Sequence, residues 1–349
     1  MAEPFVINGQ RIPPGSRTTV DLPVAQLHTH TPVNMPVQVV RGRRDGPRVF
    51  VSAAVHGDEL NGVEIIRRLL RHRSLRRMWG TLVAVPIVNV HGVLNHSRYL
   101  PDRRDLNRAF PGSERGSLTA RLAHLFMTEI VANCSHGIDL HTGAIHRANL
   151  PQIRADLSND ETARLAKLFG VPVLLNAGLR DGSLRQAASE RGMPMLLYEA
   201  GEALRFDDFS IRVGVRGVLN ILRALGMLRP SRRKHPLPEP FIARSSSWVR
   251  APQSGFLRTT ASLGDRVEKG RRLGTVADPF GDSETPVQAH AGGIVVGQTN
   301  LPLANEGDGL FHIARFEAAD EVAAQVEALH SEHDQGIPEE PGEEAEDID

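Results

Sequence analysis

A strand, a tight turn and a helix follow one another between Val49 and Leu70, and this unit constrains the fold most strongly. The apolar run VFVSAAV predicts a buried strand, and NGVEIIRRLL predicts the helix. A parallel strand that leads directly into a helix is typical of an α/β sheet. The turn between them places His56 and Glu59 three residues apart, where an imidazole and a carboxylate can bind one divalent cation.

A third candidate ligand, His141, follows the apolar part of GIDLHTG at 137–143. In open α/β sheets the ligand crevice lies outside the carboxyl ends of the strands, so two such turns from neighbouring strands can face each other. Three protein ligands leave one position for water, which is typical of catalytic zinc. The single cysteine, Cys134, excludes a cysteine-rich structural site. We therefore predict one Zn²⁺ per chain, bound by His56, Glu59 and His141.

The composition narrows the class of protein and its partners. The 349 residues suffice for one large and one small domain, or for two of ordinary size. Lys plus Arg equals Asp plus Glu at 41 each, so no overall field attracts nucleic acid or an acidic membrane. Neither an export signal nor a spanning segment is recognisable, and one cysteine excludes an internal disulfide. We expect a soluble, cytoplasmic protein, and the sequence is compatible with a homo-oligomer.

Residues 1–48 carry the alternating pattern of short antiparallel strands, at Thr18–Leu22 and Pro36–Val40. We expect them to form the edge of a sheet. His28 and His30 could chelate a metal from one face of a short strand, but nothing nearby supports a site, so a surface role is favoured.

Strands and helices then alternate as far as residue 228, which predicts an α/β fold with a mainly parallel, mixed sheet flanked by helices. We expect this part, 1–228, to be the catalytic domain. The expected strands are 80–88, 137–141, 171–175 and 193–199, and the expected helices are 117–133, 159–169, 183–190 and 211–225.

The composition changes after residue 228. Residues 229–240 contain four prolines and a basic cluster, which predicts a linker. Residues 241–330 contain two similar phrases, beginning at Ala251 and Ala289, and this internal repeat predicts a small all-β barrel or sandwich domain. Residues 331–349 are acidic, and we expect a disordered tail.

The repeat resembles the hammerhead fold of biotinyl and lipoyl carrier domains. The turn between its halves, DPFGD at 278–282, has no lysine where a carrier lysine would stand, and Lys269 lies in an earlier turn. We therefore predict the fold without the prosthetic group.

A long polar loop at 89–112 follows a buried strand, where ordered loops commonly serve a site. It contains Arg98, Asn107 and Arg108. Arginine grips a carboxylate with two parallel hydrogen bonds and keeps its charge, so these residues indicate an anionic substrate.

Glu199 ends the apolar strand MPMLLYEAG at the same edge of the sheet. A carboxylate beside a metal-activated water can accept its proton and pass it to a leaving amine. Glu202 competes for this role, but it falls in the following turn, so Glu199 is favoured.

Five motifs follow one another over about residues 45–225: HGDE at 56–59, NxxGxxxxxRYxP at 89–101, DLNRAFPG at 105–112, DLHTG at 139–143 and YEAGE at 198–202. Together, and in the family's order, they resemble the succinylglutamate desuccinylase/aspartoacylase family of the zinc carboxypeptidase superfamily. The resemblance implies a zinc carboxypeptidase-like fold, and the appended β domain also looks like that of family members.

Carried over by motif, the resemblance implies that His56, Glu59 and His141 bind zinc and that Glu199 is the general base and acid. It also implies that Arg98 polarises the scissile carbonyl, while Asn107 and Arg108 bind a substrate carboxylate. The family's deacylases use further substrate-binding Arg and Tyr residues after the third ligand, and Arg180, Arg185 and Arg191 are all in range.

The function expected from this resemblance is removal of an acyl group from an N-acyl amino acid or a related small carboxylate-bearing amide. Two alternatives stay open. A zinc carboxypeptidase acting on short peptides would share the zinc, the base and the arginines. A non-catalytic binding module could retain the fold, although the complete set of residues argues against it.

Overall fold

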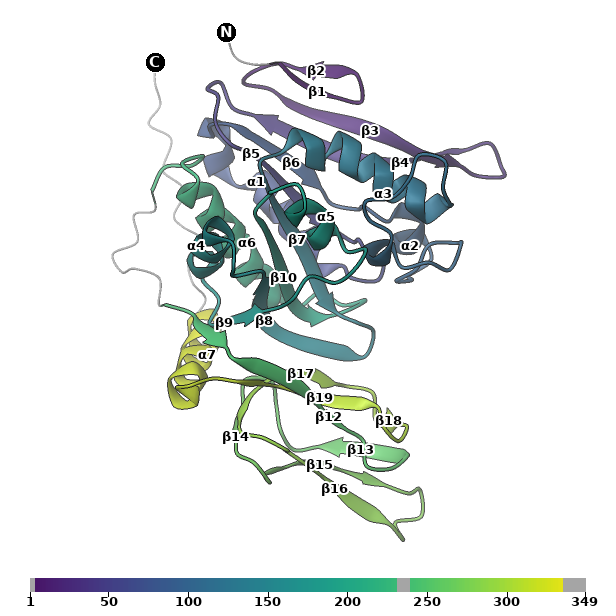
Figure 1. Ribbon diagram of the computed structural model, residues 1–349, viewed down its shortest axis with the longest axis vertical. Helices are drawn as coiled ribbons and strands as arrows, with labels where there is room; N and C mark the ends of the chain where they lie inside the picture. Colours follow the sequence, from purple (N-terminus) through teal and green to yellow (C-terminus); the bar gives the residue numbers. More distant parts are fainter. Residues whose placement is uncertain (1–3, 231–238, 335–349) are drawn as a thin grey trace.

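A mixed sheet of 13 strands runs through the molecule in the computed structural model, which describes residues 4–230 and 239–334 (Figure 1). Its main path is, in spatial order, β12 (Ser245–Arg250), β19 (Gly309–Arg315), β17 (Gly293–Thr299), β8 (Arg147–Ala155), β10 (Met195–Glu202), β7 (His136–Gly143), β5 (Arg48–Ala53), β6 (Thr81–Val85), β4 (Pro32–Arg41) and β3 (Arg17–Gln26). Beside this path, β9 (Val173–Asn176) pairs with β8, β11 (Phe241–Ala243) with β9, and β14 (Arg266–Val267) with β17.

The centre of this sheet is parallel, as predicted, because β10, β7, β5 and β6 run in one direction. These strands are buried along almost their whole length, which explains their continuous apolar sequences. At one edge of the sheet β3 and β4 pair antiparallel, and β4 pairs antiparallel with β6. His28 and His30 lie in the exposed turn between them, and Gln26 contacts the His30 ring.

Helices cover both faces of the sheet. One apolar core lies between the sheet and α1 (Asn61–Arg71), α4 (Asp160–Phe169) and α6 (Asp208–Ala224). A second core lies between the opposite face and α3 (Leu118–Glu129) and α5 (Leu184–Ser189). The short helix α2 (Val90–Leu94) follows β6, and β1 (Phe5–Ile7) and β2 (Gln10–Ile12) form a separate hairpin. The predicted α/β class is confirmed.

Side-chain caps fix where the predicted helices begin. Ser117, Asn159 and Ser183 each accept a hydrogen bond from a backbone N–H of the first turn of α3, α4 and α5. Helix α6 begins three residues before the predicted Ile211, because the Asp207 carboxylate caps the Ser210 N–H. Among residues 4–230 and 239–334, no helix has the length and apolar character of a membrane span.

The C-terminal repeat forms the predicted β sandwich. A second sheet contains β16 (Glu284–Gln288), β15 (Arg272–Ala277), β13 (Gly255–Thr259) and β18 (Leu303–Ala304), and an apolar core separates it from β17 and β19. The first strand of each repeat pairs with the middle strand of the other, β13 with β18 and β17 with β14. This exchange gives the unit its approximate two-fold symmetry.

The main sheet continues across the predicted domain boundary. Strand β17 pairs with β8, and β11 pairs with β9, so both parts of the chain share one sheet (Figure 1). Most of the predicted linker, residues 231–238, lies outside the described residues. The C-terminal part therefore extends the α/β sheet and is not held by a linker alone.

Besides the short helix α2, which lies in the predicted loop 89–112, two further elements were not expected from the sequence. Strand β8 contains Pro151, which argues against a strand in a sequence-based prediction. In the structure β17 pairs with residues 147–149 and β9 with residues 152–155, so Pro151 lies between the two pairings. Helix α7 (Ala319–Asp334) packs on the β unit through Val322 and Val326.

Helix α7 also corrects the predicted start of the tail. Residues 331–334, expected in the disordered tail, are the end of this helix, because its apolar side packs on the sheet. Residues 335–349 lie outside the described residues.

Candidate active site

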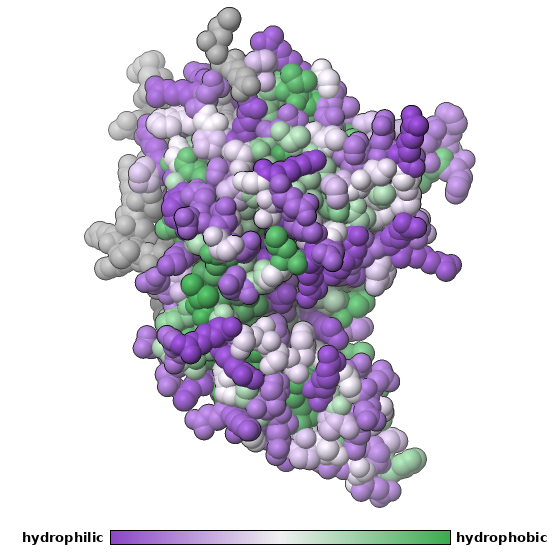
Figure 2. Space-filling model, viewed as in Figure 1, coloured by the Kyte–Doolittle hydropathy of each residue, from purple (hydrophilic) through white to green (hydrophobic). Residues whose placement is uncertain are grey.

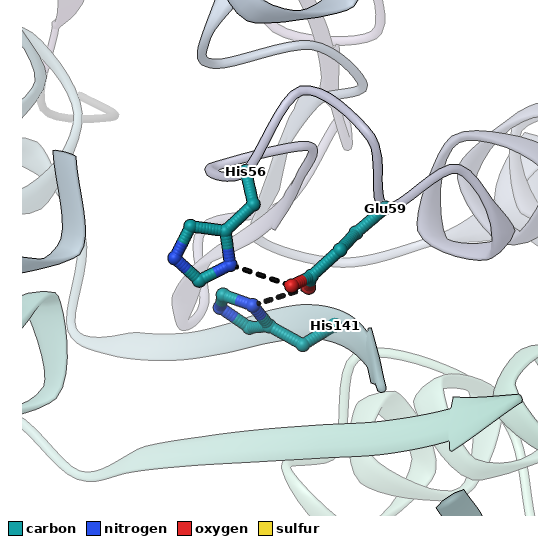
Figure 3. A group of neighbouring side chains, drawn as sticks. All are labelled: His56, Glu59 and His141. Carbon is teal, nitrogen blue, oxygen red and sulfur yellow. Dashed lines mark hydrogen bonds and ion pairs between the residues drawn. The ribbon is translucent and has the colours of Figure 1, made fainter. Parts of the chain in front are cut away.

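The three predicted metal ligands converge at the carboxyl edge of the sheet. His56 and Glu59 lie in the turn after β5, and His141 lies on the neighbouring strand β7. One ligand atom from each residue lies within 4.8 Å of the others, and all three side chains are buried. Both imidazoles direct Nδ1 at the Glu59 carboxylate, His56 at 2.7 Å and His141 at 2.8 Å (Figure 3).

The electrostatics of this cluster suit a cation. Burial opposes ionisation of Glu59, but the two imidazoles outweigh it and hold the pKa of the carboxyl well below its usual range. Burial also disfavours charged imidazoles, yet the surrounding carboxylates raise the pKa of His56 and of His141. The guanidinium Nη1 of Arg98 approaches His56 Nδ1 at 3.2 Å and Glu59 Oε1 at 3.4 Å. The donor set therefore fits a divalent metal ion.

Further carboxylates lie behind the imidazoles and orient them. His141 Nε2 lies 2.7 Å from Asp139 Oδ2, and the Ser52 hydroxyl donates to the other Asp139 oxygen at 2.7 Å. His56 Nε2 lies 3.2 Å from Asp105 Oδ1. Such partners fix the ring so that the remaining nitrogen faces the metal. Asp139 is two residues before His141 on β7, so the strand repeat places both on one face.

The turn that carries two ligands packs closely against the start of α2. A Cβ atom at Gly57 would lie 2.0 Å from the carbonyl carbon of Gly92. Asn89 caps α2 by accepting a hydrogen bond from the Gly92 N–H at 2.8 Å. Glycine at position 57 lets the two backbones touch, and this contact helps to hold His56 and Glu59 in place.

Arg98 is held at the edge of the cluster by a carboxylate. Its Nε and Nη2 donate to Asp105 Oδ2 at 3.1 and 2.9 Å. Burial opposes ionisation of Asp105, but His56 and Arg98 outweigh it and lower its pKa. The predicted arginine therefore lies beside the ligand set, as its proposed role requires.

Asn107 and Arg108 lie on a 3₁₀ turn of the same loop, Leu106–Arg108. Asn107 accepts a hydrogen bond from the Leu184 N–H at the start of α5, and its Nδ2 has no hydrogen-bond partner among the described residues. Arg108 donates from Nη1 to the Asn107 carbonyl. Both side chains keep donors that a substrate carboxylate can use.

Glu199 lies on β10 directly beside His141 of β7, so both side chains project from the same face. Its Oε2 accepts a hydrogen bond from Asn149 Nδ2 at 3.0 Å and pairs with Arg154 Nε at 3.1 Å. The competing residue Glu202 is engaged elsewhere, because Asn300 of the C-terminal part donates to its Oε2 at 2.8 Å. This arrangement favours Glu199 over Glu202.

The sequence left open which of three arginines contacts the substrate, and the structure gives the three different surroundings. Arg185 is buried and donates to the backbone carbonyls of Ala177 and Gly178, and Arg191 donates to Met127 on α3. For Arg180, partial burial and neighbouring guanidiniums, including Arg154 and Arg108, lower the pKa. The charges of Arg154, Arg108 and Glu199 therefore act on Arg180, and Arg185 holds the loop that carries Arg180.

Asn149 and Arg154 were missed in the sequence because β8 was missed. Once β8 is placed beside β10, the register sets Gln152 opposite Glu199 and Arg154 opposite Leu197. The polar residues of β8 were the only local indication that this segment contributes to the site. To use that indication, one must know that β8 is the strand beside β10.

Known proteins with a similar sequence or structure point to one family. The profile described as succinylglutamate desuccinylase/aspartoacylase catalytic domain matches residues 45–225. The chain is 27% identical over 294 residues to the N-alpha-acetyl-L-2,4-diaminobutyric acid deacetylase of Halomonas elongata. This alignment covers 81% of the chain and 86% of the Halomonas elongata protein.

Solved structures share the fold over most of the chain. A succinylglutamate desuccinylase/aspartoacylase from Rhodobacter sphaeroides superposes with a TM-score of 0.76 at 24% identity, covering 86% of this chain and 96% of that one. The product-bound ectoine utilization protein EutE (DoeB) of Ruegeria pomeroyi gives a TM-score of 0.77 at 23% identity, covering 85% and 95%. Because the family profile covers residues 45–225 of 349, this chain belongs to the succinylglutamate desuccinylase/aspartoacylase family.

Proposed function

We propose that this protein is a zinc-dependent deacylase that hydrolyses the amide bond of an N-acyl amino acid or a related small amide bearing a carboxylate. The observation that carries the proposal is the buried group of His56, Glu59 and His141 with Glu199 on the adjacent strand beside His141. The related Halomonas elongata protein is a deacetylase of an N-acetylated amino acid, which supports the same class of reaction.

Two imidazoles and one carboxylate are a known ligand set of catalytic zinc, and three ligands leave a coordination position open. A zinc ion held by His56, Glu59 and His141 would polarise the substrate carbonyl and lower the pKa of a water molecule from 15.7 toward about 7. Asp139 and Asp105 hold the two rings through Nε2, with Nδ1 of each directed at the Glu59 carboxylate. We propose one ion per chain.

Glu199 moves the proton in this proposal. Its Oε2 is held by Asn149 and Arg154, and its Oε1 has no polar partner among the described residues. The free oxygen accepts a proton from the attacking water and returns it to the departing nitrogen. General base and acid catalysis of this kind contributes about 10²–10⁴ in rate.

Arg98 stabilises the charge that develops on the carbonyl oxygen. Its guanidinium is fixed by Asp105 beside the ligand atoms before substrate arrives. Positive charge placed in advance where negative charge develops is a large catalytic contribution, and loss of one such donor costs about 10²–10³ in rate.

The substrate carboxylate is bound by donors that the protein leaves available. These are the Nδ2 group of Asn107 and the guanidiniums of Arg108 and Arg180. Such donors suit an anion because a planar guanidinium matches a carboxylate. The products are a carboxylic acid and an amine, and one of these two products carries the carboxylate by which the substrate is bound.

The proposal is tested by release of free amine from N-acetyl, N-succinyl and N-formyl amino acids and from short peptides. We expect cleavage of N-acyl amino acids that is lost after chelation and restored by zinc. Cleavage of peptides alone would identify a carboxypeptidase instead. Zinc binding without turnover of any compound would indicate a binding module.

A further inference from the structure

The C-terminal β unit touches the residues that hold Glu199. Asn149 donates to Glu199 Oε2 from strand β8, and Arg154 of the same strand pairs with the same oxygen. Strand β8 has the C-terminal strand β17 as its other neighbour over residues 147–149, and Gly297 of β17 lies directly opposite Asn149. The side chain that bonds to Glu199 thus comes from a strand that lies between the two parts of the chain.

The space beside Asn149 exists only because residue 297 is glycine. A Cβ atom at Gly297 would lie 2.9 Å from Asn149 Oδ1 and 3.2 Å from the Cβ of His312. The first contact involves the end of a side chain, which can rotate, whereas the backbone pairing around it cannot easily shift. An added methyl group would therefore turn the Asn149 amide away from Glu199.

Arg154, the second residue that holds Glu199 Oε2, also interacts electrostatically with the C-terminal unit. His312 of β19 is buried, and burial together with the nearby Arg154 charge lowers its pKa to about 4. The His312 ring stacks on Trp248 with centroids 4.9 Å apart. Because the Arg154 charge acts on this ring, the C-terminal unit borders both groups that hold Glu199 Oε2.

We infer that the C-terminal β unit positions the general base, with Gly297 and Asn149 as positioning residues that hold Glu199 Oε2 and leave Oε1 toward the reacting water. This inference rests on the proposed role of Glu199. It gives the β unit a role in turnover that needs no contact between the unit and the substrate.

The test compares Gly297→Ala, Asn149→Ala and the double variant on the N-acyl amino acid that the wild type cleaves fastest. We expect kcat to fall about 10-fold in each single variant, since one hydrogen bond to a charged group is lost. KM and zinc content should not change. The double variant should be no slower than Asn149→Ala, because glycine acts through the asparagine. Gly292→Ala, where a Cβ meets nothing closer than 3.5 Å, is the matched control and should behave as wild type.

A crystal structure of Gly297→Ala supplies a readout without turnover. The inference predicts that His56, Glu59 and His141 stay in place while Asn149 Nδ2 moves beyond hydrogen-bonding distance of Glu199. Unchanged kcat, an unchanged Asn149–Glu199 bond, additive losses in the double variant, or loss of zinc would each overturn it. Activity in Glu199→Gln would refute the proposed role of Glu199 itself. This result distinguishes a failure of the proposed function from a failure of the positioning role of the β unit.

Discussion

At the scale of single residues, the site is a set of charges that restrain one another. Glu59 contacts both imidazoles, Asp139 and Asp105 lie behind them, and Arg98 joins Asp105 to the ligand group. The candidate ligands could be proposed from the sequence because His56 and Glu59 follow an apolar strand and His141 lies near the end of another. The groups behind them belong to several strands and loops, so their roles could be assigned only from the fold.

Replacing Asp139 with asparagine should weaken zinc binding by about 10–100-fold, because His141 loses the carboxylate that orients its ring and raises its basicity. Competition with a chromophoric chelator measures this affinity. His28→Ala, in the exposed turn between β3 and β4, serves as a control and should bind zinc as the wild type does. Equal affinity for Asp139→Asn and wild type would show that the carboxylate does not support the ligand.

His312 should make stability depend on pH. Burial and the Arg154 charge lower its folded-state pKa to about 4, below the usual 6.5. Between these values the unfolded chain binds a proton that the folded chain does not, so stability falls as pH decreases from 6.5 to about 4, by on the order of 3 kcal/mol in total. His312→Phe keeps an aromatic ring against Trp248 but cannot titrate. Denaturant unfolding should give a smaller loss in the variant, and equal losses in both proteins would contradict this assignment.

At the scale of secondary structure, the helices could be predicted from residues adjacent in the sequence, whereas the strands depend on which segments pair with them. Ser117, Asn159 and Ser183 cap helices where the sequence predicted them, because a cap and its first turn are adjacent in the chain. Strand β8 was missed because Pro151 is acceptable only where neither neighbouring strand pairs with it. That condition is set by β9 and β17 and cannot be read from the sequence near Pro151.

The loop between β9 and α5 should determine substrate affinity through Arg180. Arg185 holds the loop by donating to the carbonyls of Ala177 and Gly178, and the charges of Arg154, Arg108 and Glu199 act on Arg180. We expect Arg180→Ala to raise KM about 10-fold for an N-acyl amino acid with little change in kcat, because a charged contact to the substrate is removed. Arg191→Ala, whose arginine contacts Met127 instead, is the control. Equal KM values for the two variants would exclude Arg180 from substrate binding.

At the scale of the whole molecule, one sheet joins the catalytic and C-terminal parts. The repeat predicted the β sandwich, because both halves are visible in the sequence. The joining of the sheets through β8 with β17 and β9 with β11 was not predictable, since those pairings connect residues more than 60 positions apart. On the face shown in Figure 2, apolar patches are small and are interrupted by hydrophilic side chains.

Removal of residues 241–349 should destabilise the catalytic part. The truncation would expose the edges of β8 and β9 and apolar residues such as Leu150, Val173 and Leu175. We expect this fragment to aggregate and to retain less zinc than the full chain, measured by light scattering and metal analysis. Truncation after Asp334 removes none of the described strands and should leave both properties unchanged. A monodisperse fragment with full zinc content would show that the two parts fold independently.

The most direct test of the account is a paired measurement of zinc content and turnover in wild type and Glu199→Gln. The amide keeps the shape of the side chain but cannot accept the proton, so we expect equal zinc, near one ion per chain, and a fall in kcat of about 10²–10⁴. Near-normal turnover in Glu199→Gln would remove Glu199 as the base. A wild-type protein that binds no zinc at His56, Glu59 and His141 would contradict the proposed zinc site.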